Sequence, residues 1–166
     1  MKKITGARVL IPGRFQPLHY GHMALVTQAT RAGATDVVFG VRCMPMNAKN
    51  PLSTLEACDV IGEVFKEVCE PTIDIRMIPN LVEKNWGQRV LKQVGPIDIV
   101  YAVNPRLRAA FKGLVPLGNV SRRVKGLSAT DLRRLVRDVQ CIRKCMLKIA
   151  PQGSVDALLR HMLDLA

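Results

Sequence analysis

The stretch from Ile11 to His22 constrains the fold more than any other part of the chain, because it predicts a strand that passes directly into a helix. An apolar run over 7–11 predicts a buried strand, and residues 23–32 predict a helix that a glycine ends. His19 and His22 fall where this helix begins. Two imidazoles on one face of a first turn, beside its unbonded N–H groups, favour an anion. We therefore predict a phosphate site here rather than two surface histidines.

Strand-like and helix-like segments alternate along the chain. Ser53 and Glu56 have the spacing of a capping box, and Leu55, Ile61 and Phe65 predict the buried face of the helix that follows. Strands alternating with helices predict an α/β fold with a parallel sheet of about five strands and helices on both faces. Predicted strands cover 7–11, 35–41, 72–78, 97–103 and a short part of 114–124; predicted helices cover 53–69, 86–94, 105–112 and a C-terminal segment, 128–166.

The loops that follow the predicted strands share one edge of the sheet. In parallel sheets, ligands bind beyond the carboxyl ends of the strands. Four segments follow a predicted strand: the stretch from Ile11 to His22, which we call the histidine turn, a mobile loop over 42–52, the loop after Ile78, and Asn104. Asn104 is itself placed as a helix N-cap before a proline. We therefore expect one ligand site at this edge.

Composition limits the class of protein. With 166 residues the chain predicts a single domain, 1–166, with its core over 7–136. The net charge of +12 suits a polyanionic ligand, but aromatics make up only 4%, so nucleic acid is not favoured. No apolar run reaches membrane-spanning length, and no membrane partner is expected. Five cysteines without a CxxC pair indicate reduced thiols in the cytoplasm rather than a metal site.

The histidine turn resembles the HxGH signature of the nucleotidyltransferase superfamily, in the GRFQPxHxGH form typical of archaeal-type nicotinamide-nucleotide adenylyltransferases. The resemblance implies a Rossmann-like, doubly wound domain that transfers AMP from ATP to a phosphate-bearing acceptor. It implies that His19 and His22 are catalytic and contact ATP. The matching residues are Gly13, Arg14, Phe15, Gln16, Pro17, His19, Gly21 and His22, of which Gly13, Arg14, Phe15 and Gly21 complete the expected ATP contacts.

A second stretch, 128–134, resembles the S-[SG]-T-x-[IL]-R motif of the same family. The resemblance implies that Ser128, Thr130 and Arg133 bind the outgoing phosphates of ATP, with Arg133 also catalytic. Ala129 departs from the usual serine or glycine but is small. Asn104 resembles the end of the family's fourth strand, which implies that it lies near the nucleotide.

The acceptor is expected to contact Asn85 and Trp86. In similar adenylyltransferases a tryptophan at this place stacks on the nicotinamide ring, and a cationic pyridinium would gain from an indole face. The alternative is that Trp86 is a core aromatic at a helix start. Two loops depart from the family's usual sequence, over 40–47 and 80–84, and they bear on the identity of the acceptor more than on the chemistry.

The resemblance implies direct attack by an acceptor phosphate on the α-phosphorus of ATP, with Mg²⁺ carried by the nucleotide. The GRFQP form and Trp86 favour nicotinamide mononucleotide as the acceptor. The alternatives are pantetheine-phosphate adenylyltransferase or another nucleotidyltransferase of the superfamily and, from a different class, a non-catalytic nucleotide- or RNA-binding protein. The resemblance also implies a homo-oligomer.

Overall fold

The computed structural model describes residues 6–47, 49–66, 71–81, 84–120, 151 and 153. Strands and helices alternate in these ranges, as predicted. None of the helices in them is long and apolar enough to cross a membrane. In chain order the elements are β1 (Ala7–Gly13), α1 (Tyr20–Arg31), β2 (Ala34–Arg42), α2 (Thr54–Phe65), β3 (Thr72–Ile78), α3 (Trp86–Val94), β4 (Ile99–Val100) and α4 (Pro105–Phe111).

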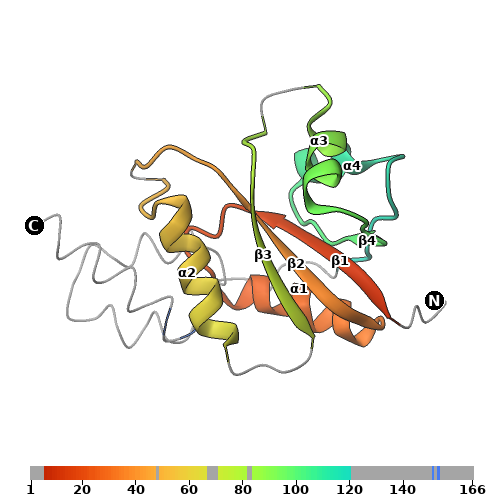
Figure 1. The fold of residues 1–166 in the computed structure, drawn as a ribbon, viewed down its shortest axis with the longest axis horizontal. Helices are drawn as coiled ribbons and strands as arrows, with labels where there is room; N and C mark the ends of the chain where they lie inside the picture. Colours follow the sequence, from red (N-terminus) through yellow and green to blue (C-terminus); the bar gives the residue numbers. More distant parts are fainter. Residues whose placement is uncertain are drawn as a thin grey trace, which may run out of the picture. The chain divides into compact units, whose positions relative to one another are not determined.

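The strands form one parallel sheet in the order β3-β2-β1-β4 (Figure 1). This is the doubly wound, Rossmann-like arrangement that the sequence predicts. The direction of winding reverses between β1 and β4, and ligands bind at such a switch point beyond the strand ends. The described residues contain four strands rather than five. In place of a fifth strand, Leu117 makes an isolated parallel bridge to Val100, whose N–H donates to the Pro116 carbonyl at 2.9 Å.

The described residues fall into two compact units. The sheet unit contains 6–13, 25–43, 71–81 and 84–120, and the loop–helix unit contains 14–24, 44–47, 49–66, 151 and 153. That residues 1–166 form a single domain stays a prediction. The predicted C-terminal helical segment, 128–166, lies outside the described residues apart from 151 and 153.

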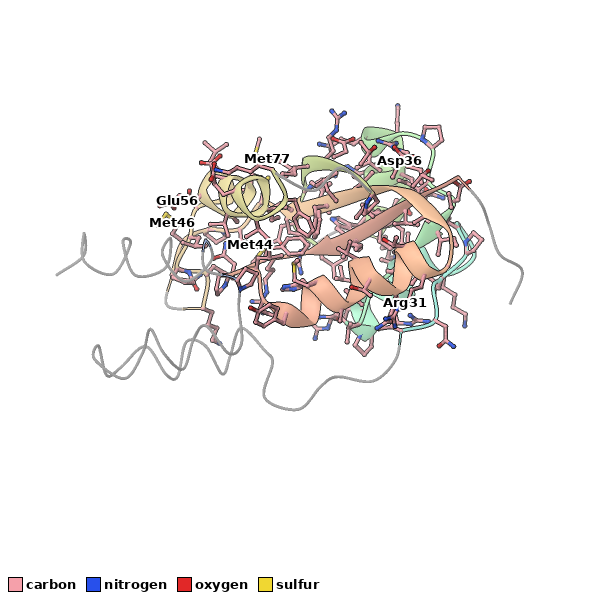
Figure 2. All side chains as sticks on the ribbon, turned by 90° about the horizontal axis from the view of Figure 1, so that it is seen from below. Arg31, Asp36, Met44, Met46, Glu56 and Met77 are labelled. Carbon is pink, nitrogen blue, oxygen red and sulfur yellow. The ribbon has the colours of Figure 1, made fainter. Side chains whose placement is uncertain are left out.

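The core of the sheet unit lies between the sheet and the helices α3 and α4. Leu10, Val38 and Ile78, one from each of three neighbouring strands, are at most 1% exposed and belong to this cluster. Alternate residues such as Val9 and Phe39 are also fully buried and point to the other face, along which residues 25–31 of α1 run (Figure 2). The sheet therefore carries helices on both faces, as predicted. The helical residues of the cluster are Trp86, Val90, Val94, Leu107 and Phe111.

A glycine allows α3 and α4 to pack closely. A Cβ added at Gly87 would overlap the carbonyl oxygen of Ala110 and lie 3.0 Å from a methyl group of Leu114. Only a residue without a side chain fits at this crossing.

Arg8 joins distant parts of the sheet unit. Its guanidinium donates to the Val94 carbonyl and to the Asp74 carboxylate, each at 2.8 Å. Its backbone N–H donates to the carboxylate of Asp98, also at 2.8 Å. One residue of β1 thus contacts β3, the end of α3 and the segment leading into β4.

Helix α2 begins as predicted and buries a face that differs from the predicted one. Ser53 and Glu56 form the complete capping box, with bonds of 3.2 and 2.7 Å. Ile61 and Phe65 are buried, but Leu55 is 64% exposed, so its assignment to the buried face was wrong. Leu55 precedes Ile61 by six residues, and at about 100° per residue it projects about 120° away from that face.

Candidate active site

The histidine turn leaves the sheet at the end of β1, because Arg14 follows Gly13 directly. Helix α1 begins at Tyr20, three residues before the predicted start. His19 therefore occupies the N-cap position, and its carbonyl accepts the N–H groups of His22 and Met23 at 2.8 and 3.2 Å. His22 lies in the first turn of the helix, as the spacing of the motif predicts.

The two histidines cap the helix with their own side chains. His19 Nδ1 accepts the N–H of Gly21 at 3.1 Å, and His22 Nδ1 accepts the backbone N–H of His19 at 3.3 Å. The rings stack with centroids 3.8 Å apart. This is the reciprocal pattern of a capping box, built from imidazoles in place of serine and glutamate. We name His19 and His22 the imidazole capping pair.

The capping bonds determine which ring nitrogen of each imidazole carries the proton. An Nδ1 that accepts a hydrogen bond carries no proton, so each neutral ring has its proton on Nε2. Burial and the neighbouring His19 both lower the pKa of His22 well below 6.5. The ring of His22 is thus neutral at physiological pH and offers one N–H donor.

The loop that leads into the imidazole capping pair is held by a clamp, which is the pair of hydrogen bonds between the side chain of Gln16 and the backbone of Leu52. The side-chain amide of Gln16 donates to the Leu52 carbonyl at 2.8 Å and accepts the Leu52 N–H at 2.9 Å. Gln16 is 3% exposed. The preceding Phe15 is buried with a positive φ of 51°, and its ring centroid lies 4.8 Å from that of His22. The clamp therefore supports the loop immediately before the helix start.

The loop over 44–53 is organised by hydrogen bonds of its asparagines. Asn47 and Asn50 exchange backbone hydrogen bonds of 3.0 and 2.8 Å. The Oδ1 of Asn50, which is 3% exposed, accepts the guanidinium of Arg14 at 3.4 Å. Arg14 is itself exposed. This loop thus orients the one cation of the GRFQP sequence.

Trp86 lies in the core of the sheet unit. The indole is 2% exposed, donates from Nε1 to the Pro79 carbonyl at 2.8 Å and meets the ring of Phe111 edge-on, with centroids 5.4 Å apart. In this structure it offers no open ring face to a ligand. The neighbouring Asn85 is exposed at the N-cap position of α3 and makes no side-chain cap bond.

Asn104 caps α4 as predicted. Its Oδ1 accepts the Arg106 N–H at 2.9 Å, and Pro105 occupies the first turn. Because Asn104 follows β4, it lies on the carboxyl side of the sheet at the switch point between β4 and β1. The topology therefore places it where nucleotide ligands bind in folds of this kind.

Sequence reasoning missed the supporting residues Gln16, Asn47 and Asn50. Gln16 stood inside the recognised motif, but only the fold brings it to Leu52, 36 residues away. The paired asparagines flanking a short turn were a usable signal for a closed loop. Ser128, Thr130 and Arg133 lie outside the described residues. In the described part of the chain, no three His, Cys, Asp or Glu side chains come together as a metal site.

Comparisons with known proteins agree with this geometry. The sequence model of the cytidylyltransferase-like family matches residues 10–135. A nicotinamide-nucleotide adenylyltransferase from Pyrobaculum aerophilum is 32% identical over 137 residues, covering 78% of this chain and 76% of the relative.

Solved structures share the fold at lower identity. A bifunctional NMN adenylyltransferase/ADP ribose pyrophosphatase from Francisella tularensis superposes with a TM-score of 0.72 at 17% identity, covering 94% of this chain and 50% of that one, so this chain spans about half its length. The same enzyme complexed with AMP and a manganese ion gives a TM-score of 0.64 at 17% identity, covering 96% and 54%.

A third structure is the Plasmodium falciparum nicotinic acid mononucleotide adenylyltransferase complexed with NaAD, with a TM-score of 0.64, 11% identity and coverage of 95% and 97%. The parallel sheet, the imidazole capping pair and these matches identify the chain as a member of the cytidylyltransferase-like family and of its nicotinamide-nucleotide adenylyltransferases.

Proposed function

We propose that this protein transfers AMP from ATP to nicotinamide mononucleotide, forming NAD and releasing pyrophosphate. The imidazole capping pair carries the proposal. It supplies two N–H donors at a helix N-terminus, where the helix dipole also favours negative charge. The family assignment selects the adenylyl transfer from the reactions that such an anion site could serve.

In the proposed reaction, a phosphate oxygen of the acceptor attacks the α-phosphorus of ATP. A P–O bond forms to the acceptor, the bond between the α-phosphorus and the bridging oxygen breaks, and pyrophosphate leaves with the electron pair. The acceptor phosphate is already ionised, so no general base is needed. His19 and His22 donate to phosphate oxygens as charge shifts onto pyrophosphate, and Arg14 neutralises part of that charge.

Other contacts are carried over from the sequence. We propose that Gly13, Phe15 and Gly21 complete the ATP contacts with Asn104, and that Ser128, Thr130 and Arg133 bind the outgoing phosphates. Asn85 lines the acceptor site, and Trp86, buried in the core, holds this side of the site in place. The full set of proposed site residues is His19, His22, Gly13, Arg14, Phe15, Gly21, Asn104, Ser128, Thr130, Arg133, Asn85 and Trp86.

The divalent ion enters with the nucleotide in this proposal. A structural relative was solved with AMP and a manganese ion. We propose Mg·ATP as the substrate, because a compact hydrated cation bridging phosphate oxygens requires few protein ligands. We also propose that the protein acts in the cytoplasm as a homo-oligomer.

The test is pyrophosphate release from Mg·ATP with nicotinamide mononucleotide and phosphopantetheine supplied separately. We expect release with the mononucleotide, and NAD as the product. Release with phosphopantetheine alone would keep the mechanism and overturn the acceptor. Silence with both, together with nucleic-acid binding that persists at high salt, would favour the non-catalytic alternative.

A matched variant separates catalysis from helix capping. The double substitution His19→Ser, His22→Gln builds an ordinary capping box, like the one that Ser53 and Glu56 form in this chain. It should keep the thermal stability but lower kcat by about 10²–10³, since the imidazole donors are lost. Full activity in a folded double variant would remove the pair from the mechanism.

A further inference from the structure

Strand β3 forms one edge of the sheet (Figure 1). Its last residue, Ile78, turns its backbone toward β2, because its carbonyl accepts the N–H of Cys43 at 2.8 Å. Backbone groups alternate in direction along a strand, so the N–H and C=O groups of Ile73, Ile75 and Met77 point away from β2. Among the described residues, no strand pairs with this outer side of β3. We call the outer side of β3 the β3 edge, and such an edge is a template for pairing with another strand.

The β3 edge has a defined length and is symmetric about Ile75. Pro71 and Pro79 each lie four residues from Ile75, and a proline has no N–H to donate. The N–H donors of the edge therefore lie between these two prolines. Within this stretch the Met77 carbonyl accepts the side-chain amide of Gln93 at 2.7 Å, which leaves the oxygen a second lone pair for a further bond.

The charged residues of β3 select one register for pairing with a second copy. Two β3 strands related by a two-fold axis run antiparallel, and residues whose backbone points outward must oppose one another. An axis through Asp74 or through Arg76 would set that residue against its own copy, so that like charges meet. An axis through Ile75 sets Asp74 against Arg76 of the partner subunit, in a non-hydrogen-bonded pair, where side chains lie closest. The charges of β3 therefore favour the axis through Ile75.

Both faces of the paired strands are complementary in this register. On one face, Arg76 Nε already donates to the Asp74 carboxylate of its own strand at 2.8 Å, and the Arg76 side chain is 56% exposed. The two-fold axis would thus place four charges of alternating sign around itself. On the other face, Ile75 would meet its own copy, and Ile73 would meet Met77 of the partner subunit. Because Met77 is 45% exposed in one copy, this pairing would remove apolar surface from water.

We propose that the β3 edge is a homodimer interface, in which β3 pairs antiparallel with β3 of a second copy about a two-fold axis through Ile75. The four described strands of each copy, β3-β2-β1-β4, then join into one continuous sheet. The occupant is a second copy rather than another protein, because the charge sequence of Asp74 and Arg76 is complementary to its own reversal. One strand pair makes a small interface, so we expect a dissociation constant of about 1–100 μM.

Sedimentation velocity over about 1–300 μM protein tests the interface, and the wild type should shift from monomer to dimer. Arg76→Glu sets a carboxylate against Asp74 of the partner subunit at two symmetric places, so it should weaken association at least about tenfold. Arg31→Glu is the matched control: it makes the same charge change in the last turn of α1, far from Met77 in Figure 2, and should leave association unchanged. Circular dichroism verifies that both variants are folded.

A mixture of two variants tests the register. Asp74→Lys should also fail to self-associate, whereas Asp74→Lys mixed with Arg76→Glu should form heterodimers, since every opposing pair then has opposite charges. Asp74 also binds Arg8 at 2.8 Å, so a second measurement covers the case in which Asp74→Lys does not fold. Ile75→Cys should cross-link to its own copy under mild oxidation, with Cα atoms about 5.5 Å apart. Met77→Cys, about 13 Å from its copy in this register, is the control and should not cross-link above the wild-type level.

Three outcomes would overturn this inference. The first is a wild type that stays monomeric over the whole concentration range. The second is a folded Arg76→Glu that associates as tightly as the wild type, and the third is a Met77→Cys that cross-links as fast as Ile75→Cys. An assembly larger than a dimer supports the interface if Arg76→Glu halves its mass and overturns it otherwise. None of these measurements uses ATP or an acceptor, so their result is independent of the proposed reaction.

Discussion

The imidazole capping pair shows how one residue can serve structure and chemistry at once. A serine in the N-cap position would satisfy the helix equally well, but its hydroxyl ends at the capping bond. Histidine has a second nitrogen on the opposite side of its ring, so capping through Nδ1 leaves Nε2–H for another oxygen. The helix start therefore fixes the tautomer that a phosphate-binding imidazole needs.

The buried ring of His22 predicts a pH dependence of stability. Burial and His19 lower the pKa of His22 below 6.5, its value in an unfolded chain. As the pH falls below 6.5, the unfolded chain takes up this proton first, so the free energy of unfolding decreases, by at most about 1.4 kcal/mol per pH unit. Above that pH the contribution is complete. Urea unfolding at pH 7.5, 6.5 and 5.5 measures the slope.

His22→Gln is the control for this prediction, because glutamine can accept the same N–H and does not titrate. Its stability should fall less steeply over this range than that of the wild type. Equal slopes in the two proteins would assign the pH dependence to other groups.

Gln16 predicts a stability effect at the residue scale. Gln16→Leu fills a similar volume but leaves the buried N–H and carbonyl of Leu52 without their side-chain partner. We expect a loss of about 2 kcal/mol in the free energy of unfolding, measured by urea denaturation. Gln88→Leu, on the exposed side of α3, is the control and should change stability by less than about 0.5 kcal/mol. Equal losses in both variants would contradict the clamp.

At the scale of elements, sequence periodicity predicted the bounds of a helix or strand correctly where neighbouring elements bury it. The bounds of β3 and α3 agree with the predicted 72–78 and 86–94. Strand β4 is shorter than predicted, because a strand extends only as far as a neighbouring strand pairs with it, and only Val9 and Leu10 do so here. The histidine turn was recognisable from local chemistry, whereas the contacts of Gln16 with Leu52 and of Arg8 with Asp74 join residues more than 30 positions apart. No local pattern encodes such pairs.

The contacts of Trp86 at the start of α3 predict that this residue affects stability more than binding of the acceptor. Trp86→Phe removes the N–H bonded to Pro79 and leaves a space beside Phe111. We expect a loss of about 1–3 kcal/mol in the free energy of unfolding, with KM for the mononucleotide changed less than about twofold. Thermal unfolding and steady-state kinetics on the same preparation measure both. A large rise in KM without a loss of stability would instead make the indole a ligand contact.

At the scale of the whole molecule, the charge favours its proposed substrates. A net charge of +12 attracts nucleoside triphosphate and mononucleotide phosphate from solution. Salt screens this attraction over about 10 Å at 0.1 M. Salt therefore lowers the rate at which the substrates meet the protein rather than the rate of the chemical step, because groups already in contact with phosphate are screened less.

Raising NaCl from 0.05 to 0.5 M should therefore lower kcat/KM for Mg·ATP several-fold, up to about tenfold, and change kcat much less. Glucose at matched osmolality is the control for water activity and should have little effect. A parallel decrease in kcat and kcat/KM would contradict electrostatic attraction and indicate a salt effect on the folded state.

The contacts of Arg8 have a consequence for synthesis of the chain on the ribosome. Its N–H binds Asp98, 90 residues later. At about 5–20 residues per second, β1 is made roughly 5–20 seconds before this partner is added to the chain. During that interval β1, one of the two inner strands of the finished sheet, has an edge of backbone N–H and C=O groups without a partner strand. The nascent protein is therefore most exposed to misassociation before residue 98 emerges, and a chaperone that shields β1 would act in this interval.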